Sequence, residues 1–105
     1  MITGNRATSG AGTAVYTPDP ITESIRFGPF VQLQLNEAGP VVVVLKFGKD
    51  GTYTTFYKVT LQSSGDGVLI TDFPVQTSKR GESLYVDLSS SKSVDYVFEI
   101  SDTQY

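Results

Sequence analysis

The 105-residue chain contains no cysteine, no histidine and no tryptophan. Without cysteine it has no disulfide framework, no thiolate nucleophile and no cysteine-ligated metal. Without histidine it lacks the commonest general base and the usual transition-metal ligand. We therefore expect that the chain is not an enzyme, and that it has no catalytic residues, no metal site and no cofactor.

Clustered positive charge and long apolar runs are also scarce. Eight Lys and Arg stand against eleven Asp and Glu, and the one adjacent basic pair, Lys79-Arg80, lies in a polar stretch that reads as a solvated loop. Binding of nucleic acid needs clustered basic residues, so no nucleic-acid partner is expected. The longest apolar run, Val41 to Leu45, is too short to span a membrane, and Met1 to Arg6 lacks the apolar region of a secretory signal. No membrane partner is expected either.

Carboxylates are the chemistry that remains. Glycoside hydrolysis needs two acids that converge on a groove, but here only Asp72 shares the parity of apolar neighbours, and a buried acid is more often a structural hydrogen-bond acceptor. Asp50 and Asp66 stand in glycine-rich turns without the spacing of a calcium loop. Acids favour turns because they bond to the local backbone, so neither hydrolysis nor calcium binding is predicted.

The first twenty residues are rich in Thr, Gly, Ser and Pro, with few large apolar side chains. Such a segment buries too little surface to offset the entropy of ordering itself, which predicts an extended arm that is disordered when free. Residues 13–17 have moderate β propensity, and the two prolines that follow keep the backbone extended. The arm is either a loose terminus or a partner-binding segment, whose candidate contact residues are Thr13, Val15, Tyr16, Pro18 and Pro20.

Residues 21–105 form the predicted second part of the chain, a single domain with a period of two. Ile25, Phe27 and Val31 share the buried parity of the first strand, which is interrupted at Gly28-Pro29, where a bulge or bend is expected. Asp50-Gly51 predicts a tight hairpin, and the polar stretch 75–83 is expected to cross between sheets. Further strands are predicted at 41–47, 53–61, 68–73, 84–88 and 94–100. The pattern predicts an all-β fold, an antiparallel β-sandwich of jelly-roll-like or immunoglobulin-like type with an extended N-terminal arm.

Several apolar side chains fall on the outward parity of these strands. Their number favours an interface between copies of the chain, although a strand covered on both faces would give the same pattern. The candidate oligomer-interface residues are Phe30, Val42, Val44, Phe56, Tyr85 and Val97. Tyr53, Tyr57 and Tyr96 are assigned to the core, which leaves few aromatic rings for stacking on a sugar.

The arm from Met1 to Pro20 and the β body from Glu23 to Ser101 together resemble the capsid decoration (cement) proteins of tailed bacteriophages. The resemblance implies a non-enzymatic virion structural protein on the capsid surface, whose partners are copies of itself in a homotrimer and the major capsid protein. It supplies no active-site residues. The alternative is a carbohydrate- or receptor-binding β-sandwich module of a fibre or secreted protein.

Overall fold

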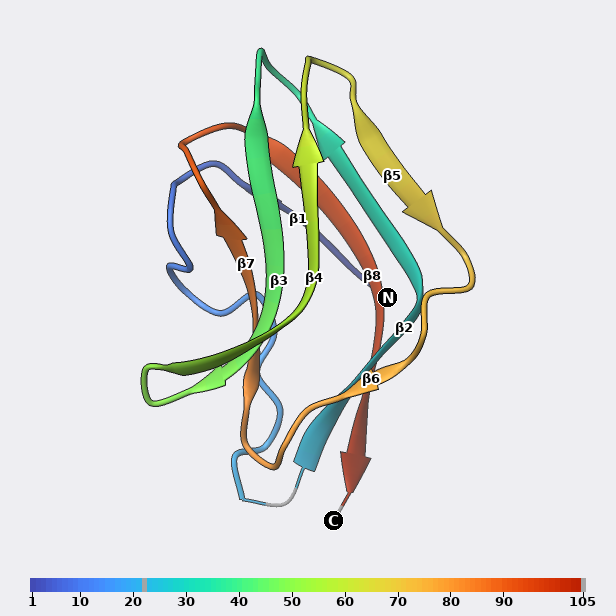
Figure 1. The fold of residues 1–105 in the computed structure, drawn as a ribbon. Coiled ribbons are helices and arrows are strands. Elements are labelled where there is room, and N and C mark those ends of the chain that lie inside the picture. The colour runs from blue at the N-terminus through green and yellow to red at the C-terminus, as the bar shows by residue number, and fades with distance from the viewer. Residues whose placement is uncertain (22, 105) are drawn as a thin grey trace.

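The protein is an antiparallel β-sandwich, which confirms the predicted fold class. The computed structural model describes residues 1–21 and 23–104, and within them all regular elements are strands. Sheet A has the strand order β1-β8-β2-β5, with β6 also paired to β2, and sheet B has the order β4-β3-β7 (Figure 1). The strands are β1 (Ile2–Arg6), β2 (Glu23–Leu35), β3 (Val41–Lys49), β4 (Thr52–Leu61), β5 (Gly67–Ile70), β6 (Gln76–Thr77), β7 (Ser83–Leu88) and β8 (Val94–Gln104).

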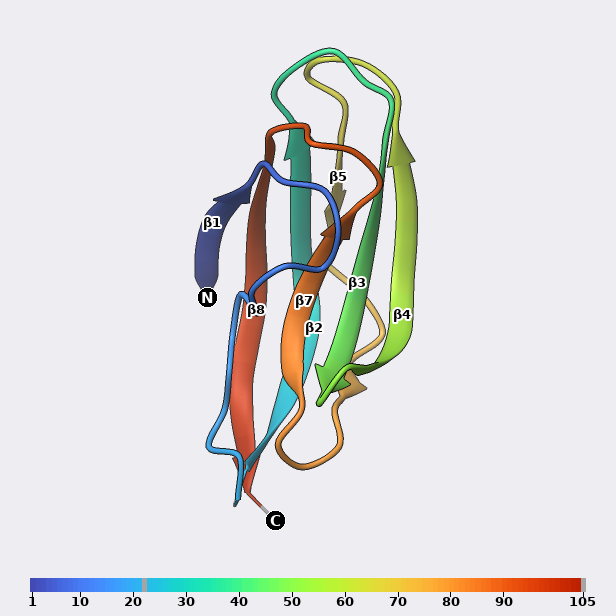
Figure 2. The ribbon, with the colours of Figure 1, turned by 90° about the vertical axis from the view of Figure 1, so that its left-hand side faces the viewer.

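The core lies between the two sheets, as the two layers of Figure 2 show. In sheet A, Val31 is in register with Phe98 and Leu33 with Tyr96, so their side chains share the inward face. In sheet B, Leu45 is in register with Val86 on the opposing inward face. Full burial of each such side chain contributes about 1.5–3 kcal/mol, and this alternation is what fixes the register of the strands.

Two β-bulges, one in β2 and one in β4, determine which side chains of these strands face the core. The register of β2 against β8 shifts between Phe27 and Val31, which confirms the bulge expected at Gly28-Pro29. A second shift occurs in β4, where Thr55 and Tyr57 pair with consecutive residues of β3 and Phe56 is the extra residue. An extra residue reverses the parity on one side of it. The alternation predicted for β4 is therefore correct after Phe56, but it is wrong before it, where Tyr53 and Thr55 are exposed.

Two connections have the predicted geometry. Asp50 and Gly51 form the tight turn between β3 and β4, both with positive φ, at 54° and 81°. The stretch 75–83 leaves sheet A through β6 and enters sheet B at β7, so it crosses between sheets as predicted. The strand expected at 68–73 is shorter and ends at Ile70.

The first twenty residues lie on the sandwich instead of extending away from it. β1 pairs with β8 at an edge of sheet A, and Gly10 and Tyr16 then form bridges to Leu88 and Leu84 of β7. Figure 2 shows this segment crossing from one sheet to the other on the side that faces the viewer. The structure thus differs from the expected free, disordered arm. Its composition offers little apolar surface, but the unpaired main-chain groups of two strand edges supply hydrogen bonds that composition does not reveal.

Candidate functional site

The six candidate interface residues do not form one patch. Phe30, Val42, Val44, Tyr85 and Val97 are half-buried, and none of them belongs to the core or packs against it. By strand alternation, Val42, Val44 and Tyr85 lie on the outer face of sheet B, whereas Phe30 and Val97 lie on the outer face of sheet A. Phe56 was expected on an outer face and this was wrong, because the bulge turns its ring toward Phe27 and Phe47.

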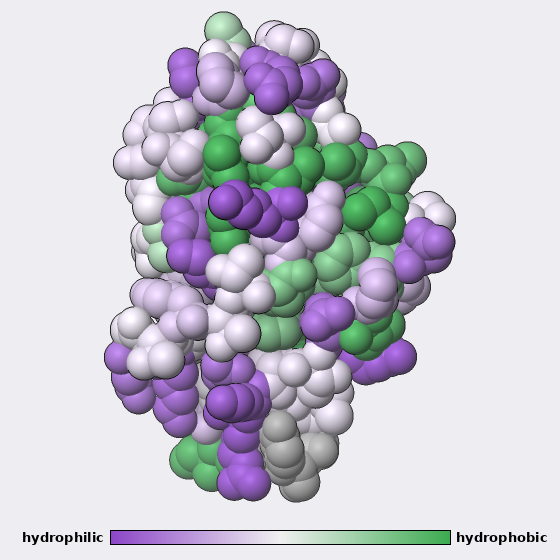
Figure 3. All heavy atoms as spheres, viewed as in Figure 1, coloured by the Kyte–Doolittle hydropathy of each residue, from purple (hydrophilic) through white to green (hydrophobic). Residues whose placement is uncertain are grey.

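The outer face of sheet B, which faces the viewer in Figure 3, combines apolar and charged side chains. Val44 is in register with Lys58 on one side and Asp87 on the other. The Lys46 Nζ lies 2.6 Å from Asp87 Oδ2, and both side chains are about one-fifth exposed (21% and 23%). Hydrophobic atoms gather over the upper part of β3 in Figure 3.

Tyr53 is a candidate surface residue on this face that the sequence pattern did not indicate. It was assigned to the core, but its side chain is 42% exposed and its ring meets that of Tyr85 edge-on, with centroids 5.1 Å apart. The Lys46 ammonium lies 5.5 Å from the Tyr53 ring centroid, close enough for a cation–π attraction. The bulge at Phe56 reverses the parity of the residues before it, and this turns Tyr53 to the outer face. No glycine or proline in the sequence marks that bulge.

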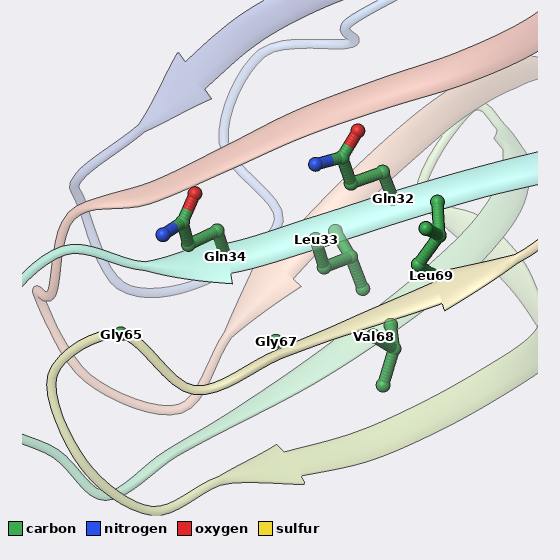
Figure 4. Close-up of a pocket in the computed structure, with 7 residues that line it drawn as sticks. All are labelled: Gln32, Leu33, Gln34, Gly65, Gly67, Val68 and Leu69. Carbon is green, nitrogen blue, oxygen red and sulfur yellow. The ribbon is translucent and has the colours of Figure 1, made fainter.

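The outer face of sheet A is more polar. Val97 is in register with Thr3 and Gln32, and Leu69, which is 64% exposed, lies next to Gln32 on β5. Figure 4 shows Gln32, Gln34 and Leu69 projecting to the same side of the sheet, along a shallow pocket of about 290 Å³. Asp95 is also on this face, and hydrogen bonds from the side chains of Asn5 and Asn36 lower the pKa of its carboxyl group.

A second hollow of about 540 Å³ lies on the open side of the sandwich, between β4 and the segment that follows β5. Phe56, Tyr57, Ile70 and Phe73 provide its apolar lining, and burial raises the pKa of Tyr57. Asp72 is exposed and is the one carboxylate among the lining residues. The hollow therefore lacks the second acid that glycoside hydrolysis requires.

Of the two acids in glycine-rich turns, Asp66 bonds to the local backbone. The Oδ2 atom of Asp66 accepts hydrogen bonds from the N–H groups of Gln62 and Ser63, at 2.9 and 3.2 Å. Across residues 1–21 and 23–104, no cluster of three acids is arranged to hold a metal ion. The same residues contain no helix long and apolar enough to cross a membrane.

Besides the pairing of β1 with β8, the C-terminal half of the arm is also fixed to the body. Val15 N–H donates to the Leu84 carbonyl at 2.9 Å, the Tyr16 hydroxyl donates to Asp102 Oδ1 at 2.5 Å, and Pro18 is buried. Thr13 and Pro20 are exposed. The structure thus brings three of the candidate arm residues against the chain's own body and leaves these two in solvent.

The Tyr16 phenol should titrate about two pH units later than an ordinary tyrosine. Its hydrogen bond to Asp102, with partial burial and the charges of Asp102 and Glu23, raises its pKa from 10.0 to about 12. Because the docked arm holds the phenol proton more tightly, this contribution to docking should be fully present below pH 10 and be lost as the pH rises through 12. Absorbance at alkaline pH measures this. Burial also raises the pKa of Tyr57 and Tyr96, so Tyr16→Phe should remove one tyrosine from the late part of the titration, and Asp102→Asn should move that one toward 10. A late part of unchanged amplitude in Tyr16→Phe would contradict the assignment.

No family model, curated protein or solved structure matches this chain. The features of the molecule that bear on its function are the two outer faces, the apolar hollow beside β4 and the docked arm.

Proposed function

We propose that this chain is a non-enzymatic virion structural protein, a capsid decoration protein that associates with copies of itself and attaches to the major capsid protein. The observation that supports this most is the presence of half-buried apolar side chains, among them Val42, Val44 and Val97, on both outer faces and outside the core. Val42 and Val44 are successive outward residues of β3, and Tyr85 lies on the neighbouring strand; adjacent apolar side chains rimmed by polar ones are typical of surfaces that contact other proteins.

The proposed role also agrees with the chemistry of the surface. The apolar side chains are interspersed with charged ones such as Lys58, Asp87 and Glu99, as in interfaces that form between already folded proteins. In the proposed homotrimer, three copies attached together raise the effective concentration of each contact with the shell. Weak individual contacts then give firm attachment.

Light scattering on the purified protein tests the self-association that the proposal requires. We expect a mass of about three chains of 11.4 kDa each at micromolar concentration. Val44→Thr keeps the shape and removes apolar contact, so it should weaken association about tenfold while changing the free energy of unfolding by less than about 0.5 kcal/mol. A wild-type protein with the mass of a single chain would contradict the proposal.

The second candidate is a carbohydrate- or receptor-binding module, and one observation favours it. The exposed Tyr53 and the half-buried Tyr85 form an aromatic pair beside the Lys46–Asp87 ion pair, which combines a stacking surface with polar groups. Glycan-array binding that disappears in Tyr53→Ala and in Tyr85→Ala would favour this function. Phe30→Ala is the matched control, because that ring is half-buried, outside the core, and on the outer face of the other sheet.

A further inference from the structure

The N-terminal arm binds the body mainly through strand edges. β1 is in register with β8 over five residue pairs, from Ile2–Phe98 to Arg6–Val94. Further along, Gly10 N–H donates to the Leu88 carbonyl at 2.8 Å, and Leu84 N–H donates to the Tyr16 carbonyl at 2.9 Å. The arm is thus an added strand for β8 and then for β7, a mode of binding in which main-chain hydrogen bonds supply the affinity.

The body has a complete core without the arm. The largest fully buried side chains, with Phe27 and Phe98 foremost, all come from residues 25–98. From the arm, Ile2, Val15 and Tyr16 are only partly buried, and they pack against the rim of that core. The arm can therefore leave its site without opening the interior, which is what exchange between copies requires.

A short hinge joins the arm to β2. Asp19 closes it: its Oδ1 atom accepts the Ile21 N–H at 2.9 Å, and its carbonyl accepts the Glu23 N–H at 3.1 Å. Asp19 is exposed, so opening this turn transfers the two N–H groups to water at little cost. Pro18 and Pro20 restrict the residues before them to extended backbone in either form, which confines the rearrangement to the turn itself.

We propose that neighbouring copies exchange their arms, so that the arm of one copy occupies the β8 and β7 edges of the next. The occupant is a second copy of this chain because the site is already shaped for this segment, and the same contacts form whichever copy supplies it. Cyclic exchange among three copies closes a trimer. The inference rests on the proposed function, since it needs self-association.

The absence of cysteine makes the exchange directly measurable. Asn5 of β1 and Asp95 of β8 are in register, and the Asn5 Nδ2 lies 2.8 Å from Asp95 Oδ1. In Asn5→Cys/Asp95→Cys, oxidation should join these positions. On a denaturing gel without reductant, exchanged arms give covalently linked chains that migrate as multiples. Arms docked on their own body give a single chain with an internal disulfide.

Two further samples complete the experiment. Asn5→Cys mixed with Asp95→Cys, unfolded and refolded together, should form a linked pair containing one chain of each kind. Insertion of Gly-Ser-Gly-Ser after Pro20 lets each arm reach its own body easily and should reduce linkage between chains about tenfold. Internal disulfides alone, within an assembly of several chains, would overturn the exchange and leave the proposed function standing. A single-chain mass by light scattering would overturn both, and the absence of any disulfide would show that β1 does not lie on β8 in any copy.

Discussion

Replacing Phe27 with alanine should lower the free energy of unfolding by about 3–5 kcal/mol. Its side chain is fully buried, and its ring contacts those of Phe56, Phe73 and Phe98 with centroids 5.0, 5.6 and 5.1 Å apart. It therefore joins sheet A, sheet B and the connection after β5, and each aromatic pair adds about 0.5–1.5 kcal/mol to the burial itself. Urea unfolding followed by tyrosine fluorescence measures the change.

Phe30→Ala is the matched control, because it makes the same chemical change three residues further along β2. The Phe30 ring is half-buried and does not pack on the core, so its removal should cost less than about 1 kcal/mol. On the proposed function it should instead weaken association between copies. Equal losses of stability in the two variants would contradict the assignment of Phe27 to the core and of Phe30 to the outer face of sheet A.

The second large effect is expected at Gly67, the first residue of β5. A methyl group at this position would overlap the carbonyl oxygen of Leu33 in the neighbouring strand. Backbone cannot rotate away as a side chain can, so Gly67→Ala should destabilise the protein by about 1–3 kcal/mol. The distortion should be greatest where Gly67 and Val68 pair with β2. Hydrogen exchange of the β5 amides, together with thermal unfolding, measures both effects.

Gly48→Ala is the control for this prediction. The new methyl group would first meet the ring of Tyr53, an exposed side chain that can rotate at the expense of its surface contacts, and would then lie 3.1 Å from the Thr52 carbonyl oxygen. We therefore expect a loss below about 1 kcal/mol and unchanged exchange in β5. If both variants lose the same stability, contact with the Leu33 carbonyl is not the cause.

The sequence was sufficient to predict the strands whose faces alternate without interruption. In β3, Val41, Val43 and Leu45 are buried and the residues between them are half-buried, because burial of one face fixes the parity of every side chain in a strand. The same reasoning correctly placed β7 and β8 and the bulge at Gly28-Pro29, since a proline within a strand pattern marks an irregularity.

Two kinds of feature could not be predicted. The bulge at Phe56 has no glycine or proline to mark it. The pattern therefore predicted a buried Tyr53 and an outward Phe56, whereas Tyr53 is exposed and Phe56 packs against the core. The docking of the arm depends on which strands end as sheet edges, and strand order is set by contacts between distant segments that a local pattern does not contain. β1 and β6 were missed for the same reason, since each exists only through its neighbour in sheet A.

The position of β8 in sheet A has a consequence for the order in which the chain folds. β1 and β2 both pair with β8, so a strand from the first ten residues and one from residues 23–35 need a partner at residues 94–104. Pairing across such separations makes folding slow, in the range of milliseconds to seconds. During synthesis the hairpin of β3 and β4 is complete at residue 61, whereas sheet A must wait for residue 104. On the ribosome sheet A should therefore form only after residue 104 has been translated, even though the β3–β4 hairpin can form earlier.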